Sequence, residues 1–138
     1  VMVAWALWTV LPQANYRMQH RSEELASRGG YVLMSKANQL APKYGPRIVQ
    51  AGFENGIYFF DGTAIGDWFG PGRYRQMLDC DKGPCALVDP KAMLTVLSKV
   101  DSRMLVVNTR RFAIDLPAYQ VYFDLVSQTP DGVLLTLK

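Results

Sequence analysis

Arg103-Met104-Leu105-Val106-Val107-Asn108 is the stretch that decides the fold. Its apolar run is continuous, which is typical of a central parallel strand that is buried on both faces. A helix is predicted just before it, because Asp89-Pro90 combines an N-cap acid with a proline at the first helical position. Apolar residues then recur at helical spacing from Ala92 to Val100. A helix that leads into a buried strand indicates an α/β unit.

Further short elements surround this unit. The carboxyl-terminal residues predict a hairpin, since Thr129-Pro130-Asp131-Gly132 combines a proline that presets φ with a glycine that permits positive φ. The segment 53–60 is compatible with strand or helix by composition, and a strand that leads into a short helix suits the turn that follows. We expect further strands at 47–52, 63–65 and 86–88, and helices at 31–41 (ended by Pro42), at 70–78 and from Asp115.

This order of elements predicts the fold class. Alternating short strands and helices are typical of an α/β domain with a parallel sheet. We therefore expect residues 13–138 to form a single soluble, three-layer, Rossmann-like α/β domain. Its sheet is expected to be mostly parallel, with a C-terminal antiparallel hairpin at the edge.

The first twelve residues are uncharged and apolar, with Trp5 and Trp8 placed like an interfacial aromatic pair and Pro12 at the end of the run. One interpretation is the end of a transmembrane helix, although a complete span needs about 20 residues. The other is a buried apolar segment of the domain core. A cleavable signal peptide fits poorly, because no basic segment precedes the run and no small-residue cleavage site follows it.

Composition excludes some function classes. The chain has 138 residues, of which 49% are hydrophobic, and a net charge of +3. This is enough apolar material for one globular core. Its arginines form small groups, such as Arg73 with Arg75 and Arg110 with Arg111, instead of the continuous basic stripe of a nucleic-acid binder. We interpret these groups as a solvated surface and expect no nucleic-acid partner.

The two cysteines, Cys80 and Cys85, are separated by a turn that contains Gly83-Pro84. We favour a disulfide over two free thiols, because the turn brings the sulfur atoms together. A persistent disulfide indicates the periplasm or the cell exterior. Arg17 and Arg21 point the other way, since basic residues next to an apolar segment favour the cytoplasmic side.

Common catalytic and cofactor motifs are missing from the sequence. It contains no G-x-G-x-x-G, no G-x-x-x-x-G-K-[ST] and no G-x-S-x-G. The one histidine, His20, lies in a polar segment without an evident partner for acid–base catalysis. We therefore predict no catalytic residue, no metal site and no cofactor in this chain.

The segment Gly66–Tyr74 is the strongest candidate for a binding site. Its glycines permit close backbone approach, and Trp68 offers a stacking surface for a sugar ring or a partner. Asp67, Arg73 and Tyr74 offer hydrogen bonds, with Arg73 suited to a bidentate contact. The alternative is a structural loop in which Trp68 fills the core and Asp67 pairs with Arg73.

The chain also resembles a known family, on Asn-Gly-Ile-Tyr-Phe-Phe (55–60), Gly-Asp-Trp-Phe-Gly-Pro (66–71), the strand at 103–107 and the hairpin at 123–137. These stretches and their order are similar to the C-terminal soluble domain of polytopic GT-C type glycosyltransferases. That superfamily contains the dolichyl-phosphate-mannose protein mannosyltransferases and the aminoarabinose transferases. The resemblance extends over nearly all of residues 13–138, by pattern instead of by a sharp motif.

The resemblance implies a non-catalytic extracytoplasmic domain of an enzyme that uses a polyprenyl-phosphate sugar donor. The implied role is in acceptor recognition or assembly, and the implied partners are the transmembrane portion of the same protein and a glycan, lipid-linked sugar or protein acceptor. Two alternatives stay open. One is a membrane-tethered ligand- or protein-binding module without transferase activity. The other is a small α/β enzyme whose ligand lies at the strand ends near Gly52, Gly66–Tyr74 and Asn108-Thr109.

Overall fold

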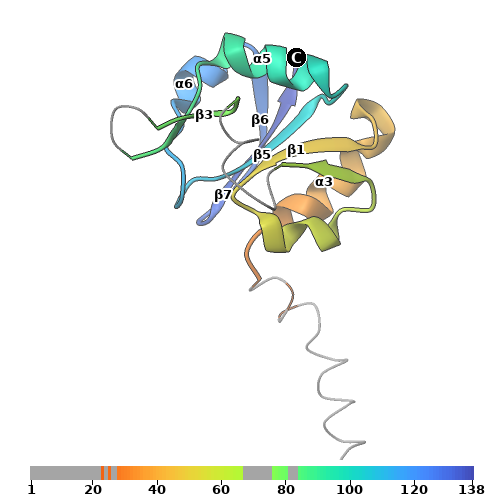
Figure 1. The fold of residues 1–138 in the computed structure, drawn as a ribbon. Coiled ribbons are helices and arrows are strands. Elements are labelled where there is room, and N and C mark those ends of the chain that lie inside the picture. Colours follow the sequence, from red (N-terminus) through yellow and green to blue (C-terminus); the bar gives the residue numbers. More distant parts are fainter. Residues whose placement is uncertain (1–22, 24, 26–27, 67–75, 81–83) are drawn as a thin grey trace, which may run out of the picture.

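The computed structural model describes residues 23, 25, 28–66, 76–80 and 84–138. These residues form an α/β structure around a five-stranded sheet, with strand order β2-β1-β5-β7-β6 (Figure 1). The strands of this sheet are β1 (Arg47–Ala51), β2 (Thr63–Ile65), β5 (Met104–Asn108), β6 (Phe123–Thr129) and β7 (Gly132–Leu137). The helices are α3 (Tyr31–Tyr44), α5 (Pro90–Lys99), α6 (Leu116–Tyr119) and the 3₁₀ helix η1 (Glu54–Phe59). A separate antiparallel ribbon pairs β3 (Leu78–Asp79) with β4 (Ala86–Leu87).

The sheet is mixed. Strands β2, β1 and β5 are parallel neighbours, and β5 is the central strand, as its apolar sequence predicts. The predicted C-terminal hairpin is confirmed, but β7 lies inside the sheet, antiparallel to both β5 and β6. Because Val133 to Leu135 are buried on both faces of the sheet, β7 gains more burial between two strands than at an edge. The sheet is therefore less parallel than the sequence predicts.

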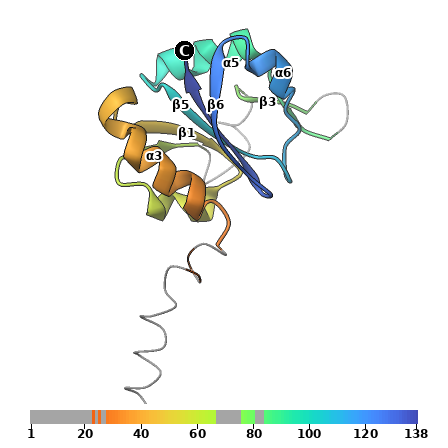
Figure 2. The ribbon, with the colours of Figure 1, turned by 180° about the vertical axis from the view of Figure 1, so that it is seen from behind.

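Helices cover both faces of the sheet (Figures 1 and 2). On one face, Met104 and Val106 of β5 pack in a cluster with α3. On the other face, Leu105 and Val107 pack in a cluster with α5. This alternation follows from the period of two in a strand, and it explains why β5 is apolar from Met104 to Val107.

Local sequence explains the ends of the two longer helices. Asp89 caps α5, since its Oδ1 accepts hydrogen bonds from the backbone N–H groups of Lys91 (2.9 Å) and Ala92 (3.1 Å). Helix α3 continues past Pro42 to Tyr44, so the prediction that Pro42 ends it is wrong. A proline in the last turn removes only one helical hydrogen bond. The helix instead ends at Gly45, whose N–H donates to the carbonyl of Ala41 (2.9 Å).

Two other segments differ from their predicted elements. The segment 53–60 forms η1, a 3₁₀ helix flanked by the buried residues Phe53 and Phe60. The predicted helix at 70–78 is wrong at its end, where Leu78 belongs to β3 and pairs with Leu87. Pairing with β4, the next strand along the chain, overrides the local helix propensity there.

Candidate functional site

Four strands of the sheet end at the same edge. Strands β2, β1 and β5 are parallel, and β6 runs in their direction because β6 and β5 are both antiparallel to β7. We call this edge, where these four strands end, the carboxyl edge. In open α/β sheets, ligands bind outside the carboxyl ends of parallel strands, at the point where successive connections leave toward opposite faces.

The segments that follow β1 and β5, which we call the exits of these strands, meet this condition. After β1, Phe53 enters the cluster on the α3 face, and after β5, Phe112 enters the cluster on the α5 face. The two connections therefore part at neighbouring strand ends. Between them is a hollow of about 480 Å³, a volume within the range of small-molecule sites. We call it the crevice; Gly52, Glu54, Asn108, Arg110, Arg111 and Asp131 are among its lining residues.

Gly52 allows the two exits to come close together. Its φ is +83°, in the left-handed region that favours glycine. A Cβ atom at this position would lie 2.9 Å from Cβ of Asn108 and 3.0 Å from Cε2 of Phe112. A glycine is therefore required here by both the backbone conformation and the available space.

The side chain of Asn108 holds together the two strand ends that meet at the crevice. Its side-chain Nδ2 donates to the carbonyl of Gly52 (3.0 Å), which joins the end of β5 to the end of β1. Its Oδ1 accepts from the backbone N–H of Arg110 (3.0 Å), which orders the turn after β5. The amide of Asn108 thus acts as a positioning group for the arginines that follow it.

Two ion pairs cross the rim of the crevice. Arg111 donates from Nη1 to Oε2 of Glu54 (2.7 Å), and this contact joins the β5 exit to η1. Arg110 lies 2.9 Å from Oδ1 of Asp131 through Nε, which also donates to the carbonyl of Pro130 (3.3 Å). The arginine side chains are 51% and 67% exposed, so these pairs add little to stability and mainly orient the charged groups.

A second hollow adjoins the crevice. Its volume is about 300 Å³, and Arg110 and Asp131 line it as they line the crevice. Its other walls include Arg28 and Gly30, which lie at the start of α3, and Thr129 at the end of β6. The Arg110–Asp131 pair therefore separates two adjoining hollows at the carboxyl edge.

A family model matches residues 20–136, and it is described as SF2091/S2213. This chain belongs to the SF2091/S2213 family. A relative from Shigella flexneri, "Uncharacterized protein SF2091.1/S2213", is 32% identical over 117 residues, which cover 85% of this chain and 98% of the relative. No solved structure matches the chain. The relative's name states no activity, so the resemblance to glycosyltransferases stays a prediction.

The region that matches the SF2091/S2213 model includes every residue of the crevice. Of the positions predicted at strand ends, the structure brings together Gly52 and Asn108, and the backbone N–H of Thr109 donates to the carbonyl of Asp131 (3.1 Å). Gly66 follows β2 at the same edge, where a Cβ atom would lie 2.6 Å from Nε2 of Gln50. The four residues predicted to bind a ligand or partner, Asp67, Trp68, Arg73 and Tyr74, lie outside the described residues.

Sequence reasoning missed the charged rim in this member of the SF2091/S2213 family. It assigned Arg110 and Arg111 to a solvated surface and did not single out Glu54 or Asp131. One signal was present, because both arginines follow directly after the strand that defines the sheet. Among the described residues, no group of three or more His, Cys, Asp or Glu side chains could hold a metal ion.

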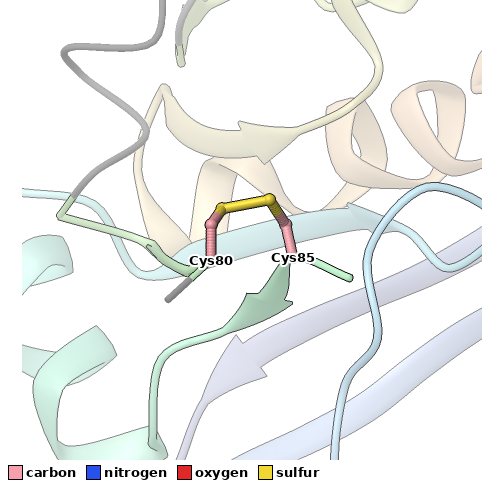
Figure 3. Close-up of a disulfide and its surroundings, with 2 residues drawn as sticks. All are labelled: Cys80 and Cys85. Atoms are coloured by element: carbon pink, nitrogen blue, oxygen red, sulfur yellow. A yellow bond between two sulfur atoms is a disulfide. The ribbon is translucent and has the colours of Figure 1, made fainter. Parts of the chain in front are cut away.

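The predicted disulfide is confirmed. Cys80 and Cys85 are bonded, and the bond joins the end of β3 to the start of β4 (Figure 3). The ribbon that it closes places Met77 and Leu87 in the core cluster on the α5 face. None of the helices in the described ranges is long and apolar enough to cross a membrane. The sequence predicts that residues 1–12 are either the end of a transmembrane helix or a buried apolar segment. These residues lie outside those ranges.

Proposed function

We propose that this chain is a non-catalytic recognition domain on the periplasmic or extracellular side of a membrane. In this proposal it is attached to the transmembrane portion of a glycosyltransferase that uses a polyprenyl-phosphate sugar donor, and it helps to recognise the acceptor. The same proposal gives the domain a three-layer, Rossmann-like architecture.

The observation that carries the proposed recognition role is the crevice at the carboxyl edge. A catalytic nucleophile needs an adjacent group that activates it. In the described part of the crevice, Glu54 and Asp131 instead contact Arg111 and Arg110. Such an arrangement binds and orients polar groups of a ligand. The disulfide supports the proposed location, because it persists in oxidising compartments.

The attachment to a membrane enzyme is tested by the coding DNA upstream of Val1. The proposal predicts eight or more apolar spans, with a pair of acidic residues in the first large loop. A start codon close to Val1, or a single span, contradicts the transferase and favours a tethered or soluble binding module.

The recognition role is tested by kinetics of the intact membrane protein. We expect Arg110→Gln to raise KM for the acceptor and to leave kcat close to wild type, because a recognition contact stabilises the bound acceptor equally in the ground state and the transition state. Arg103→Gln is the matched control, since Arg103 lies at the opposite end of β5. A large fall in kcat without a change in KM would contradict the role.

A further inference from the structure

The residues that follow β5, 109–113, carry both arginines of the crevice, and we call them the rim segment. At its start, the backbone N–H of Phe112 donates to the carbonyl of Asn108 (3.0 Å). At its end, Ala113 forms a parallel bridge with Ala86 of β4. The rim segment is therefore held between the end of β5 and the β3–β4 ribbon.

Two hydrogen bonds attach the rim segment to β4 and to the residue before it. The backbone N–H of Leu87 donates to the carbonyl of Ala113 (2.8 Å), and the N–H of Ala113 donates to the carbonyl of Cys85 (3.4 Å). Cys85 is one of the two residues of the disulfide. A backbone movement at Cys85 therefore acts directly on the end of the rim segment.

The side chain of Phe112 extends this contact to the crevice. It is buried in the cluster on the α5 face, together with Leu87 of the ribbon. Its ring lies so close to Gly52 that a Cβ atom there would be 3.0 Å from Cε2, and the guanidinium of Arg111 lies over the ring at 5.3 Å. Displacement of Phe112 would move an arginine of the crevice and would separate the exits of β1 and β5.

The ribbon that holds the rim segment is small. Among the described residues its two strands pair at two positions, and an isolated two-stranded ribbon is marginally stable in water. The Cys80–Cys85 disulfide closes the ribbon, and Cys80 is exposed (Figure 3). Exposed disulfides are more easily reduced than buried structural ones and are the kind that serves in regulation.

We propose that the Cys80–Cys85 disulfide is a redox switch for the crevice. In the disulfide form, which is the resting form in an oxidising compartment, the ribbon holds the rim segment in the position that forms the crevice. In the dithiol form the ribbon loosens, and the arginines are no longer held at the carboxyl edge. This inference rests on the proposed recognition role and names the regulation of the same site.

The switch needs a dithiol as its reductant. One thiolate of the reductant attacks Sγ of Cys80, the S–S bond breaks, and Cys85 leaves as a thiolate that takes up a proton. The second thiolate of the reductant attacks the mixed disulfide and releases Cys80, which is also protonated. Two electrons and two protons pass to the chain, and the reductant becomes a disulfide.

The test compares the two redox forms of the isotopically labelled 138-residue chain by NMR, with dithiothreitol as the reductant. Alkylation of free thiols without denaturant measures the reduced fraction. We expect dithiothreitol to reduce the folded chain, and amide signals to shift at 110–112 and at Gly52 as well as in the ribbon. Signals at the opposite edge, around 98–103, should stay unchanged.

Two variants test whether Phe112 transmits the change. In Phe112→Leu, reduction should shift the ribbon signals and leave the Gly52 signal unchanged. Phe123→Leu is the matched control, since Phe123 is buried in the same cluster but lies at the start of β6. In this control the Gly52 signal should shift as in wild type. The comparison of the two redox forms of wild type does not depend on the folding of either variant.

The double variant Cys80→Ser, Cys85→Ser separates the switch from an effect of the reductant. Its signals at 110–112 and at Gly52 should match those of reduced wild type and should not respond to dithiothreitol. Shifts confined to residues 76–88 on reduction of wild type would overturn the switch. Free thiols that appear only in denaturant would overturn it as well.

The wider function is judged by a different measurement. In the intact membrane protein, the double cysteine variant should raise KM for the acceptor, as Arg110→Gln does. Crevice signals that respond to reduction while this KM stays at the wild-type value would support the switch and contradict the recognition role. The NMR comparison needs no acceptor, so failure of the switch leaves the proposed function standing.

Discussion

At the scale of single residues, Gly52 is a position where the sheet edge tolerates little change. We predict that Gly52→Ala lowers the free energy of unfolding by about 1–3 kcal/mol, because it adds backbone strain at φ +83° and crowds Asn108. Urea unfolding measures this change. Gly29→Ala is the control, since Gly29 has no positive φ and a Cβ atom there meets nothing within 4 Å. Equal stability of the two variants would contradict the tight approach of the β1 and β5 exits.

The ionisation of Tyr119 makes the free energy of unfolding depend on pH in the alkaline range. Burial raises the pKa of its hydroxyl well above the usual value, and the nearby charge of Asp89 raises it further. The hydroxyl also donates to the carbonyl of Val88 (2.8 Å). The pKa of this hydroxyl is higher in the folded state than its unfolded-state value of about 10. The contribution of the neutral Tyr119 hydroxyl to the free energy of unfolding is therefore complete below pH 10 and is lost as the pH rises above 10.

The Tyr119→Phe variant tests this assignment. At neutral pH we expect a loss of about 1 kcal/mol in the free energy of unfolding, the scale of one hydrogen bond. Above pH 10, wild type should lose stability more steeply than the variant, by up to about 1.4 kcal/mol per pH unit. Tyr58→Phe is the control, since Tyr58 is 75% exposed. Parallel pH profiles for wild type and Tyr119→Phe would show that another group titrates.

At the scale of elements, the start of α5 depends on one side chain. Asp89→Ala removes the acceptor for two backbone N–H groups, and we expect a loss of about 1 kcal/mol in the free energy of unfolding. Asp89→Asn keeps a capping oxygen and should recover most of that stability. If alanine and asparagine are equally stable at this position in chemical denaturation, the cap is not what stabilises the helix start.

The β3–β4 ribbon depends on a covalent link. We expect the double variant Cys80→Ser, Cys85→Ser to be less stable than the oxidised chain by about 2 kcal/mol, the value that loop entropy gives for so short a loop. Reduced wild type should unfold like the double variant. If oxidised and reduced wild type unfold at the same denaturant concentration, the bond does not stabilise the ribbon.

The elements also show why local sequence predicts some structure and leaves the rest open. The strand at 103–108 and the helix after Asp89 carry strong local signals, and both are confirmed. The inner position of β7 depends on which strands it pairs with, and a hairpin turn says nothing about that choice. The segment 53–60 stayed open because buried aromatic residues fit a strand and a 3₁₀ helix equally well.

At the scale of the whole molecule, the site depends on strand order. Gly52 and Asn108 could be predicted as site residues because each lies at the end of a strand that the sequence identifies. The rim could not, since Glu54 and Arg111 are 57 residues apart and meet only because β1 and β5 are neighbours. Asp131 joins them because β6 ends at the same edge. A set of polar side chains from three connections becomes one crevice only after the sheet has formed.

The central claim is that recognition takes place at the carboxyl edge, and chemical-shift mapping tests it most directly. Glucose, as a minimal glycan probe, would be titrated into the isotopically labelled 138-residue chain, and backbone amide signals would be followed by NMR. The account predicts that the largest shifts fall at 52–56, 108–111 and 130–131. Shifts concentrated at the opposite edge, around 98–103, would contradict it.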